Sequence, residues 1–154
     1  MPIAVQIDPP WSHEDLEPLI RRAAEAALQA AGDPAGAEHV LLTVRIADAD
    51  TVRRLNRRYR GHDRPTDVLA FTVDEIDPET GLRYLGDVLI AYPVAEAQAR
   101  AGGHRVADEL QLLTVHGVLH LLGHDDEDPQ ARRRMWAVQA QVLEALGCPL
   151  RPRL

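Results

Sequence analysis

The sequence contains a single cysteine and no lysine. Because Cys148 is alone in the chain, an internal disulfide and a zinc site built from several thiolates are both excluded. Any metal site in this protein must therefore use histidine and carboxylate ligands, and a reducing compartment suits the chain. All 17 basic residues are arginine, so we draw functional information from where the arginines lie and not from their type.

Long apolar runs are also missing. No stretch reaches the roughly 18 apolar residues of a membrane-spanning helix. The N-terminal segment has neither the basic flank nor the apolar length of a signal peptide. We therefore expect a cytoplasmic protein without a membrane partner. The 154 residues suffice for one domain, spanning 1–154, with a single hydrophobic core.

Positive charge is scarce overall but concentrated in one place. The formal net charge is −7, which argues against a protein that coats nucleic acid non-specifically, because such binding depends on a basic surface. Six of the arginines nevertheless fall close together, between positions 53 and 64: Arg53, Arg54, Arg57, Arg58, Arg60 and Arg64. They predict a local basic patch on an acidic protein, although each one singly also suits a solvated helix face.

Apolar periodicity predicts an α/β fold with a mixed sheet of four strands covered by about five helices. Alternating apolar residues predict strands over 2–7, 40–46, 68–73 and 84–91. Helical spacing predicts helices over 12–31, 50–59, 93–100, 104–122 and 128–146. In the second of these helices, Val52, Leu55 and Tyr59 share one face, which we expect to point inward.

The segment HGVLHLLGHDD at 116–126 predicts a metal-binding helix. His116 and His120 are four residues apart, so their side chains lie nearly above one another and are able to hold one ion. Gly123 stands where helices commonly end with a positive φ, and a turn there would bring Asp126 back as a third ligand. The bare pair also suits two packed histidines, each satisfied by one hydrogen bond. The glycine and the acidic residues at 125–128 favour the metal.

Zinc is the expected ion, with another divalent metal as the alternative. Two imidazoles and one carboxylate with open positions suit a hydrolytic zinc site, although iron oxygenases use the same ligand set. Two ligands from one helical turn favour zinc, as does the lack of the many short strands of an oxygenase barrel. Zinc proteases share this spacing but have a glutamate directly after the first histidine as general base. Gly117 occupies that position here, so a protease is a poor fit.

Three blocks of the sequence together resemble the YbeY family of bacterial rRNA maturation factors. They are HGVLHLLGHDD at 116–126, LNRRYRGHDRPTDVLAF at 55–71 and LGDV at 85–88. The resemblance covers essentially the whole chain. It implies a metal-dependent, single-strand-specific endoribonuclease in maturation of the 3′ end of small-subunit (16S) rRNA, in ribosome assembly and in quality control. The implied partners are single-stranded rRNA, the small ribosomal subunit and assembly factors, with no role for DNA.

The resemblance also implies site residues. The family holds its metal with three histidines in the pattern His-x-x-x-His-x-x-x-x-x-His, and the matching positions here are His116, His120 and Asp126. The chain thus departs from the family at the third ligand, for which His124 is the alternative. The family has an arginine at the position of Arg60, which is expected to bind phosphate. A guanidinium suits this role because it holds two phosphate oxygens and stabilises the charge that develops during attack.

The expected mechanism is attack by metal-activated water on a phosphodiester that Arg60 holds, while Arg53, Arg57 and Arg64 guide the RNA strand. The 2′-hydroxyl of the RNA is an equally compatible nucleophile. The main alternative function is a non-catalytic assembly factor that binds RNA and uses its metal for structure. Both functions predict the same fold and the same ligands.

Overall fold

The computed structural model describes residues 3–12, 15–31, 39–61, 66–125 and 127–150. Its strands are β1 (Ile3–Ile7), β2 (Val40–Ala47), β3 (Val68–Ile76) and β4 (Arg83–Ala91). Its helices are α1 (Leu16–Ala31), α2 (Ala49–Arg60), α3 (Tyr92–Gly102), α4 (Val106–Leu121) and α5 (Pro129–Ala145). These elements agree in type and order with those that the apolar periodicity predicts.

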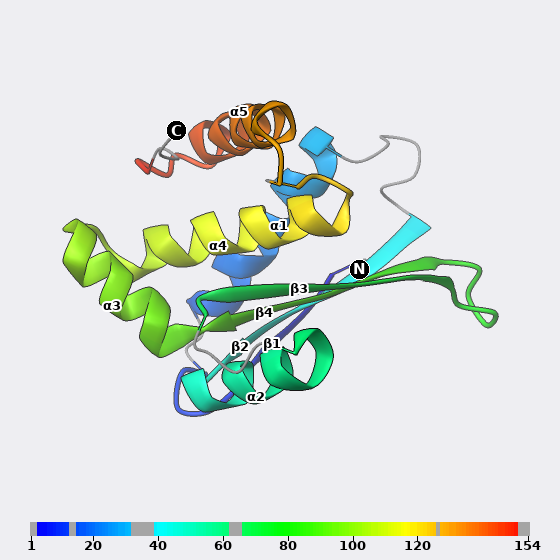
Figure 1. Ribbon diagram of the computed structural model, residues 1–154, viewed down its shortest axis with the longest axis horizontal. Helices are drawn as coiled ribbons and strands as arrows, with labels where there is room; N and C mark the ends of the chain where they lie inside the picture. The colour runs from blue at the N-terminus through cyan, green and yellow to red at the C-terminus, as the bar shows by residue number, and fades with distance from the viewer. Residues whose placement is uncertain (1–2, 13–14, 32–38, 62–65, 126, 151–154) are drawn as a thin grey trace.

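The strands form one mixed sheet in the order β1-β2-β4-β3 (Figure 1). β1, β2 and β4 run parallel to one another, whereas β3 is antiparallel to β4 and joined to it by a hairpin. Within the described ranges β3 therefore has a strand on one side only. β3 is thus an edge strand of the sheet within these ranges.

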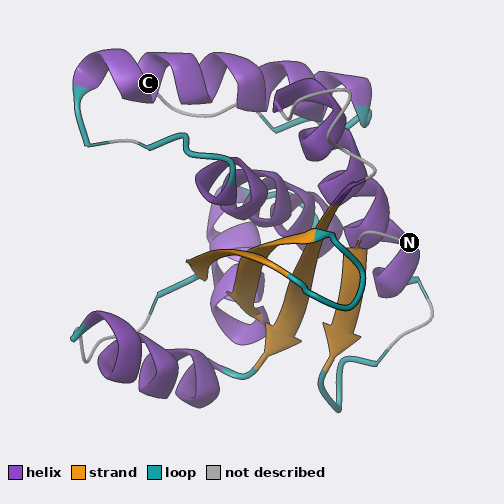
Figure 2. Cartoon of the chain, turned by 90° about the vertical axis from the view of Figure 1, so that its right-hand side faces the viewer, coloured by secondary structure: helices purple, strands orange, loops and turns teal. Residues whose placement is uncertain are grey.

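Helices cover the two faces of the sheet unequally. α1 and α4 pack on one face with α5 outside them, and α2 lies on the other (Figures 1 and 2). The larger core fills the first face and includes alternate residues of β2 and β4, all fully buried: Val44, Ile46, Val88 and Ile90. This is the period of two that a half-buried strand requires. The mixed four-stranded sheet predicted from the sequence is thereby confirmed.

α2 covers only one end of the second face. A smaller buried cluster lies beneath it and is made of Ala47, Val52, Leu69, Leu89 and Ala91. Two of these residues are the last residues of β2 and β4, so α2 shields the end of the sheet at which the parallel strands finish. No other helix of the described residues covers the rest of this face (Figure 1). Asp48 fixes the start of α2, because its carboxylate accepts a hydrogen bond from the Thr51 backbone N–H at 2.6 Å.

α4 is the central helix of the structure. It packs against the sheet and is flanked by α1, α3 and α5, which explains why its sequence is apolar on nearly every side (Figure 1). Even so, neither α4 nor any other helix in the described part of the chain is long and apolar enough to cross a membrane.

Gly117 lets α4 approach β4 closely. A Cβ atom at this position would lie 2.5 Å from Cγ1 of Val88, well inside van der Waals contact. Val88 is β-branched and fully buried, so its side chain has little freedom to move away. Gly117 occupies the position at which zinc proteases have a glutamate, and this close packing explains why the residue here is glycine.

Three details differ from the sequence prediction. α1 begins at Leu16, four residues after the predicted start at Ser12, whose hydroxyl instead donates to the Ile7 carbonyl at 3.2 Å. β3 extends to Ile76, beyond the predicted end at Val73, because the hairpin continues to pair Glu75 with Tyr84. Tyr59 was expected to point inward with Val52, yet its side chain is 61% exposed, whereas Val52 is fully buried. The prediction is wrong for Tyr59 because the last turn of α2 extends beyond the smaller buried cluster.

Substituting Gly117→Ala tests the close packing of α4 on β4. The added methyl group overpacks the contact with Val88, at a cost of about 1–3 kcal/mol. Alanine also gains about 1 kcal/mol over glycine in helix propensity. We therefore expect a net loss in the free energy of unfolding, measured by urea denaturation. In a Val88→Ala background, where the clash is relieved, the same substitution should be neutral or stabilising. A stabilising effect in the wild-type background would contradict the packing argument.

Candidate functional site

The two histidines of α4 face one another beside β3. Their ring centroids are 4.7 Å apart and their ring planes are inclined by 72°. Nε2 of His120 lies 3.2 Å from Nε2 of His116. Both residues are partly exposed, so the pair is reachable from solvent. The structure thus brings His116 and His120 together, as their spacing on a helix predicts.

Gln139 of α5 fixes the orientation of His116. Its Oε1 lies 3.0 Å from Nδ1 of His116, and since an amide oxygen only accepts hydrogen bonds, this ring nitrogen donates. Nε2 of His116 therefore has its lone pair directed toward His120. Gln139 is only 3% exposed, so the hydrogen bond is shielded from water. Partners of this kind set the tautomer and direction of metal-binding histidines.

Sequence reasoning missed Gln139. A signal was present, because Gln139 falls four residues after Met135 and three before Val142, on the buried stripe of α5. A polar side chain on such a stripe needs a buried partner. The partner comes from α4, more than twenty residues earlier, and nothing in the periodicity identifies it.

A small hollow adjoins the histidine pair. Its volume is about 150 Å³, and it is lined by three residues of β3 and three of α4: Val68, Ala70, Thr72, His116, Gly117 and His120. The β3 residues alternate along the strand, so they share the face that looks toward α4. The imidazoles thus have a wall of the edge strand opposite them and room for a small ion with substrate oxygens.

The helix turns sharply just after the pair. Gly123 has a φ of 96°, its N–H donates to the His120 carbonyl, and the N–H of His124 donates to the Leu119 carbonyl. These two bonds form a Schellman motif, which ends α4 where the sequence predicts. His124 is partly buried after this turn, and the predicted ligand Asp126 lies outside the described residues. Among the residues that are described, no third His, Cys, Asp or Glu completes a metal-binding group with the pair.

Two of the acidic residues after the turn have local roles. Asp128 caps α5 by accepting a hydrogen bond from the Ala131 N–H at 2.8 Å. Asp125 accepts one from the Glu127 N–H at 3.1 Å. The acidic cluster that favoured a metal in the sequence therefore owes part of its composition to the start of the next helix.

The donor atoms of the pair fit a small divalent ion. Two nitrogens that each lie about 2.05 Å from a tetrahedral zinc are about 3.3 Å apart. The separation between the two Nε2 atoms is 3.2 Å. The same separation also allows a hydrogen bond between the rings, so the distance suits both interpretations that the sequence left open.

Two of the predicted arginines lie across the sheet from the pair. Arg53 and Arg57 are exposed on α2, on the face opposite α4 (Figure 1). Arg60 is the last residue of α2, but its side chain lies outside the described part, as does the whole of Arg64. The structure therefore does not bring Arg53 or Arg57 next to the imidazoles.

A second polar cluster lies behind His116, in a cleft of about 870 Å³ between α3, α4 and α5. Glu109, which is 5% exposed, accepts a hydrogen bond from Nε2 of His104 at 2.6 Å. The Gln98 amide nitrogen donates to Glu109 at 3.0 Å and to Asp67 at 3.3 Å. Asp67 directly precedes β3, so this cluster ties the start of the edge strand to α4. It is a structural link that periodicity does not reveal.

A substitution at Gln139 tests the orientation of His116. Gln139→Leu removes the acceptor at Nδ1, so the Nδ1-protonated tautomer of His116 should lose population. Gln139→Glu keeps an acceptor at the same distance and should keep the tautomer. The measurement is the pair of ¹⁵N chemical shifts of the His116 ring, by long-range NMR correlation. Unchanged shifts in Gln139→Leu would show that Gln139 does not set the tautomer.

Comparison with known proteins shows which family this chain is similar to. The family model described as Endoribonuclease YbeY matches residues 6–147. A protein named Endoribonuclease YbeY from Chloroflexus aurantiacus is 45% identical over 137 residues, covering 85% of this chain and 87% of that protein. One from Salinispora tropica is 47% identical over 112 residues, covering 66% of this chain and 71% of its own length.

A solved structure agrees with these sequence matches. The solution structure of TM1509 from Thermotoga maritima matches with a TM-score of 0.57 and 26% sequence identity, over 94% of this chain and 91% of that one. The predicted resemblance is confirmed over most of the sequence, and the fold agrees with it. The chain therefore belongs to the YbeY endoribonuclease family.

Proposed function

We propose that this protein is a metal-dependent, single-strand-specific endoribonuclease. It acts in maturation of the 3′ end of small-subunit (16S) rRNA, in ribosome assembly and in quality control, in the cytoplasm. The observation that carries the proposal is the pair of imidazole nitrogens 3.2 Å apart beside the edge strand of a chain that belongs to an endoribonuclease family. Its partners are single-stranded rRNA, the small subunit and other assembly factors.

The ion is zinc, held by His116, His120 and Asp126. When bound, it supplies Lewis acidity toward the phosphodiester. The chain contributes the orientation of the ligands, since Gln139 leaves the Nε2 lone pair of His116 available for an ion. The packing of Gly117 on Val88 sets the distance of the pair from β3.

Asp126 is preferred over His124 as the third ligand. The Schellman motif at Gly123 reverses the chain directly after His120, which favours a ligand a few residues further on. Asp126 stands in register with the family's third histidine. A carboxylate oxygen is also a regular zinc ligand. His124 remains the alternative, and it would give a site of three imidazoles.

Arg60 holds the scissile phosphate. It is the last residue of α2, and the chain re-enters the described structure at Thr66, two residues before Val68, which lines the hollow beside His116. This nearness in sequence supports a position at the same edge of the sheet. The guanidinium holds two phosphate oxygens and stabilises the charge that develops on them. Arg53, Arg57 and Arg64 guide the strand toward it.

Peptide hydrolysis is disfavoured by the environment of Gly117. A metalloprotease needs a glutamate at this position as general base. The Cβ atom of any larger residue would collide with Val88, so the fold does not accommodate that side chain without shifting α4. The geometry therefore supports a phosphodiester as the substrate over a peptide.

The substitution Arg60→Ala tests the function. The zinc-loaded wild type should cleave single-stranded rRNA fragments, and the variant should lose roughly a hundredfold or more in cleavage rate, as expected for a lost contact to developing charge. Binding of the same RNA should persist. Arg134→Ala, which removes an exposed arginine from α5 and leaves α2 unchanged, is the matched control and should cleave normally. A metal-loaded wild type that binds rRNA and never cuts any RNA would support a non-catalytic assembly factor with a structural metal.

A further inference from the structure

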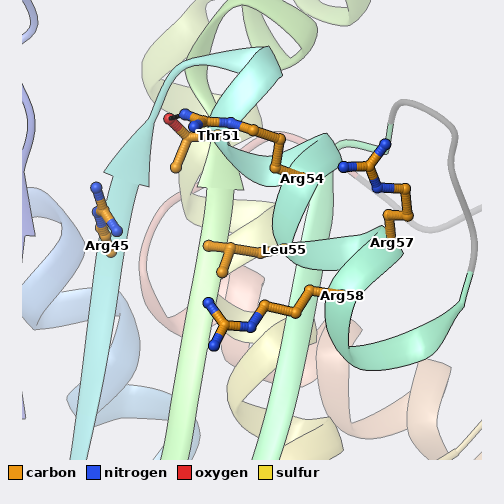
Figure 3. Close-up of a pocket in the computed structure, with 6 residues that line it drawn as sticks. All are labelled: Arg45, Thr51, Arg54, Leu55, Arg57 and Arg58. Atoms are coloured by element: carbon orange, nitrogen blue, oxygen red, sulfur yellow. Dashed lines mark hydrogen bonds between the residues drawn. The ribbon is translucent and has the colours of Figure 1, made fainter.

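The open part of the second sheet face forms a groove. It has a volume of about 730 Å³, and its walls include Thr43, Arg45, Tyr59, Phe71 and Asp87. A neighbouring hollow of about 560 Å³ shares Arg45 and Leu55 with it and adds arginines of α2 (Figure 3). We call the two together the Tyr59 groove. The imidazole pair lies on the opposite side of the sheet, and its hollow shares Ala70 and Thr72 with the groove.

An exposed aromatic ring stands over this groove. Tyr59 is 61% exposed, in a chain in which only 4% of residues are aromatic. Its ring rests against Phe71 with centroids 5.3 Å apart, and the Arg58 guanidinium lies 5.5 Å from its centroid. Tyr59 is thus packed against Phe71 and contacted by a guanidinium, while more than half of its surface stays exposed. Such rings are the platforms on which single-stranded nucleic acids stack their bases.

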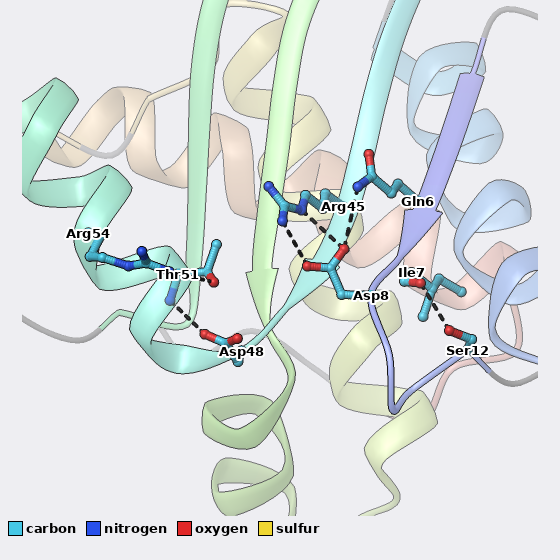
Figure 4. A network of polar contacts seen from close by, with 8 residues as sticks. All are labelled: Gln6, Ile7, Asp8, Ser12, Arg45, Asp48, Thr51 and Arg54. Carbon is cyan, nitrogen blue, oxygen red and sulfur yellow. Dashed lines mark hydrogen bonds and ion pairs between the residues drawn. The ribbon is translucent and has the colours of Figure 1, made fainter.

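Positive charge on the α2 side of the groove is partly unbalanced. Arg45 is paired with Asp8 at 2.8 Å (Figure 4), and Arg54 is paired with Asp50 at 3.2 Å. Arg57 and Arg58 form no salt bridge with any carboxylate in the described part of the chain. Arg58 extends from α2 across the strands, whereas the Arg57 side chain points away from the strands (Figure 3). A cationic rim on a protein of net charge −7 is complementary to a phosphate backbone.

The sheet side of the groove has polar side chains among apolar ones, and Asp87 is the acid in its lining. Asp87 accepts a hydrogen bond from the Tyr84 hydroxyl, which in turn lies 2.7 Å from the hydroxyl of Thr43. Burial, and after it the hydrogen bond to Asp87, raises the pKa of Tyr84 above its ordinary value, and the hydroxyl proton is held by Asp87. A ligand therefore meets hydrogen-bonding groups on the sheet and cations on α2. A nucleotide matches this arrangement, with its base against the Tyr59 ring and its phosphate toward the arginines of α2.

The groove meets the imidazole pair across the edge strand. Ala70 and Thr72 of β3 line both the groove and the hollow beside His116 and His120. Since β3 has a neighbouring strand only on its β4 side in the described ranges, a flexible chain is able to pass over its outer edge from one face to the other. A folded duplex is too thick and stiff to follow this path, whereas a single strand bends around it.

We infer that the Tyr59 groove binds a nucleotide of single-stranded RNA outside the bond at the imidazole pair, with its base stacked on Tyr59 and its phosphate near Arg58. This inference rests on the proposed function, because it takes RNA as the substrate. It explains why α2 leaves part of the sheet uncovered and why Tyr59 is exposed at the end of an otherwise inward-facing stripe. It also gives the arginines of α2 a role on the face where they lie.

The test is the affinity of full-length protein for a fluorescent single-stranded 12-nucleotide RNA, measured by anisotropy in the presence of a chelator so that the RNA stays intact. Tyr59→Ala should weaken binding by roughly 5- to 100-fold, the range for loss of one base–aromatic stack. Tyr59→Trp should keep the wild-type affinity. Arg58→Glu, an exposed charge reversal on α2, should weaken binding and reduce its dependence on salt, because fewer counterions are released from the RNA. Arg134→Ala is the control and should bind as the wild type does.

Folding and catalysis are followed separately. Thermal unfolding of each variant shows that a loss of affinity belongs to the groove and not to the fold, and Arg58→Glu decides the matter if Tyr59→Ala is unstable. Unchanged RNA affinity in both variants would overturn the inference. The same conclusion would hold if these variants bound RNA normally but no longer bound a ribosomal protein. If the wild type cleaves RNA and the variants bind normally, the groove is wrong and the ribonuclease stands. If the wild type never cleaves but the variants bind weakly, the groove stands and the ribonuclease fails.

Discussion

The structure depends on the contact between Gly117 of α4 and Val88 of β4. A helix carrying a larger residue at this point would sit further from the sheet, because 2.5 Å is too short for a Cβ contact. The close approach places the neighbouring His116, and His120 one turn later, against the wall of β3. A packing requirement in the core therefore determines where the imidazoles meet the edge strand.

The candidate site is supported from three directions. α4 supplies the histidines, α5 orients His116 through the buried Gln139, and β3 closes the hollow on the opposite side. The edge strand is also the boundary between this site and the Tyr59 groove. A single-stranded substrate that crosses β3 would contact both faces of a small sheet. An acidic protein would thereby contact a long stretch of RNA although it has few basic residues.

Much of the fold follows from local sequence signals. Apolar alternation predicted the strands and Gly123 indicated the end of α4, because caps and periodicity act within a few residues. The spacing of the histidines likewise predicted their convergence. Gln139 was not predicted because its partner is remote in sequence. Tyr59 was assigned inward because helical periodicity does not report where the sheet beneath a helix loses its cover.

Zinc K-edge X-ray absorption spectroscopy of the zinc-loaded wild-type protein tests the central claim most directly, since it counts the imidazoles bound to the ion. The claim is that His116 and His120 hold one metal through their facing Nε2 atoms. We predict two imidazole nitrogens at about 2.0–2.1 Å, with oxygen ligands completing the shell. A third imidazole would exchange Asp126 for His124 and leave the pair in place. A shell of oxygen alone, without imidazole scattering, would contradict the account.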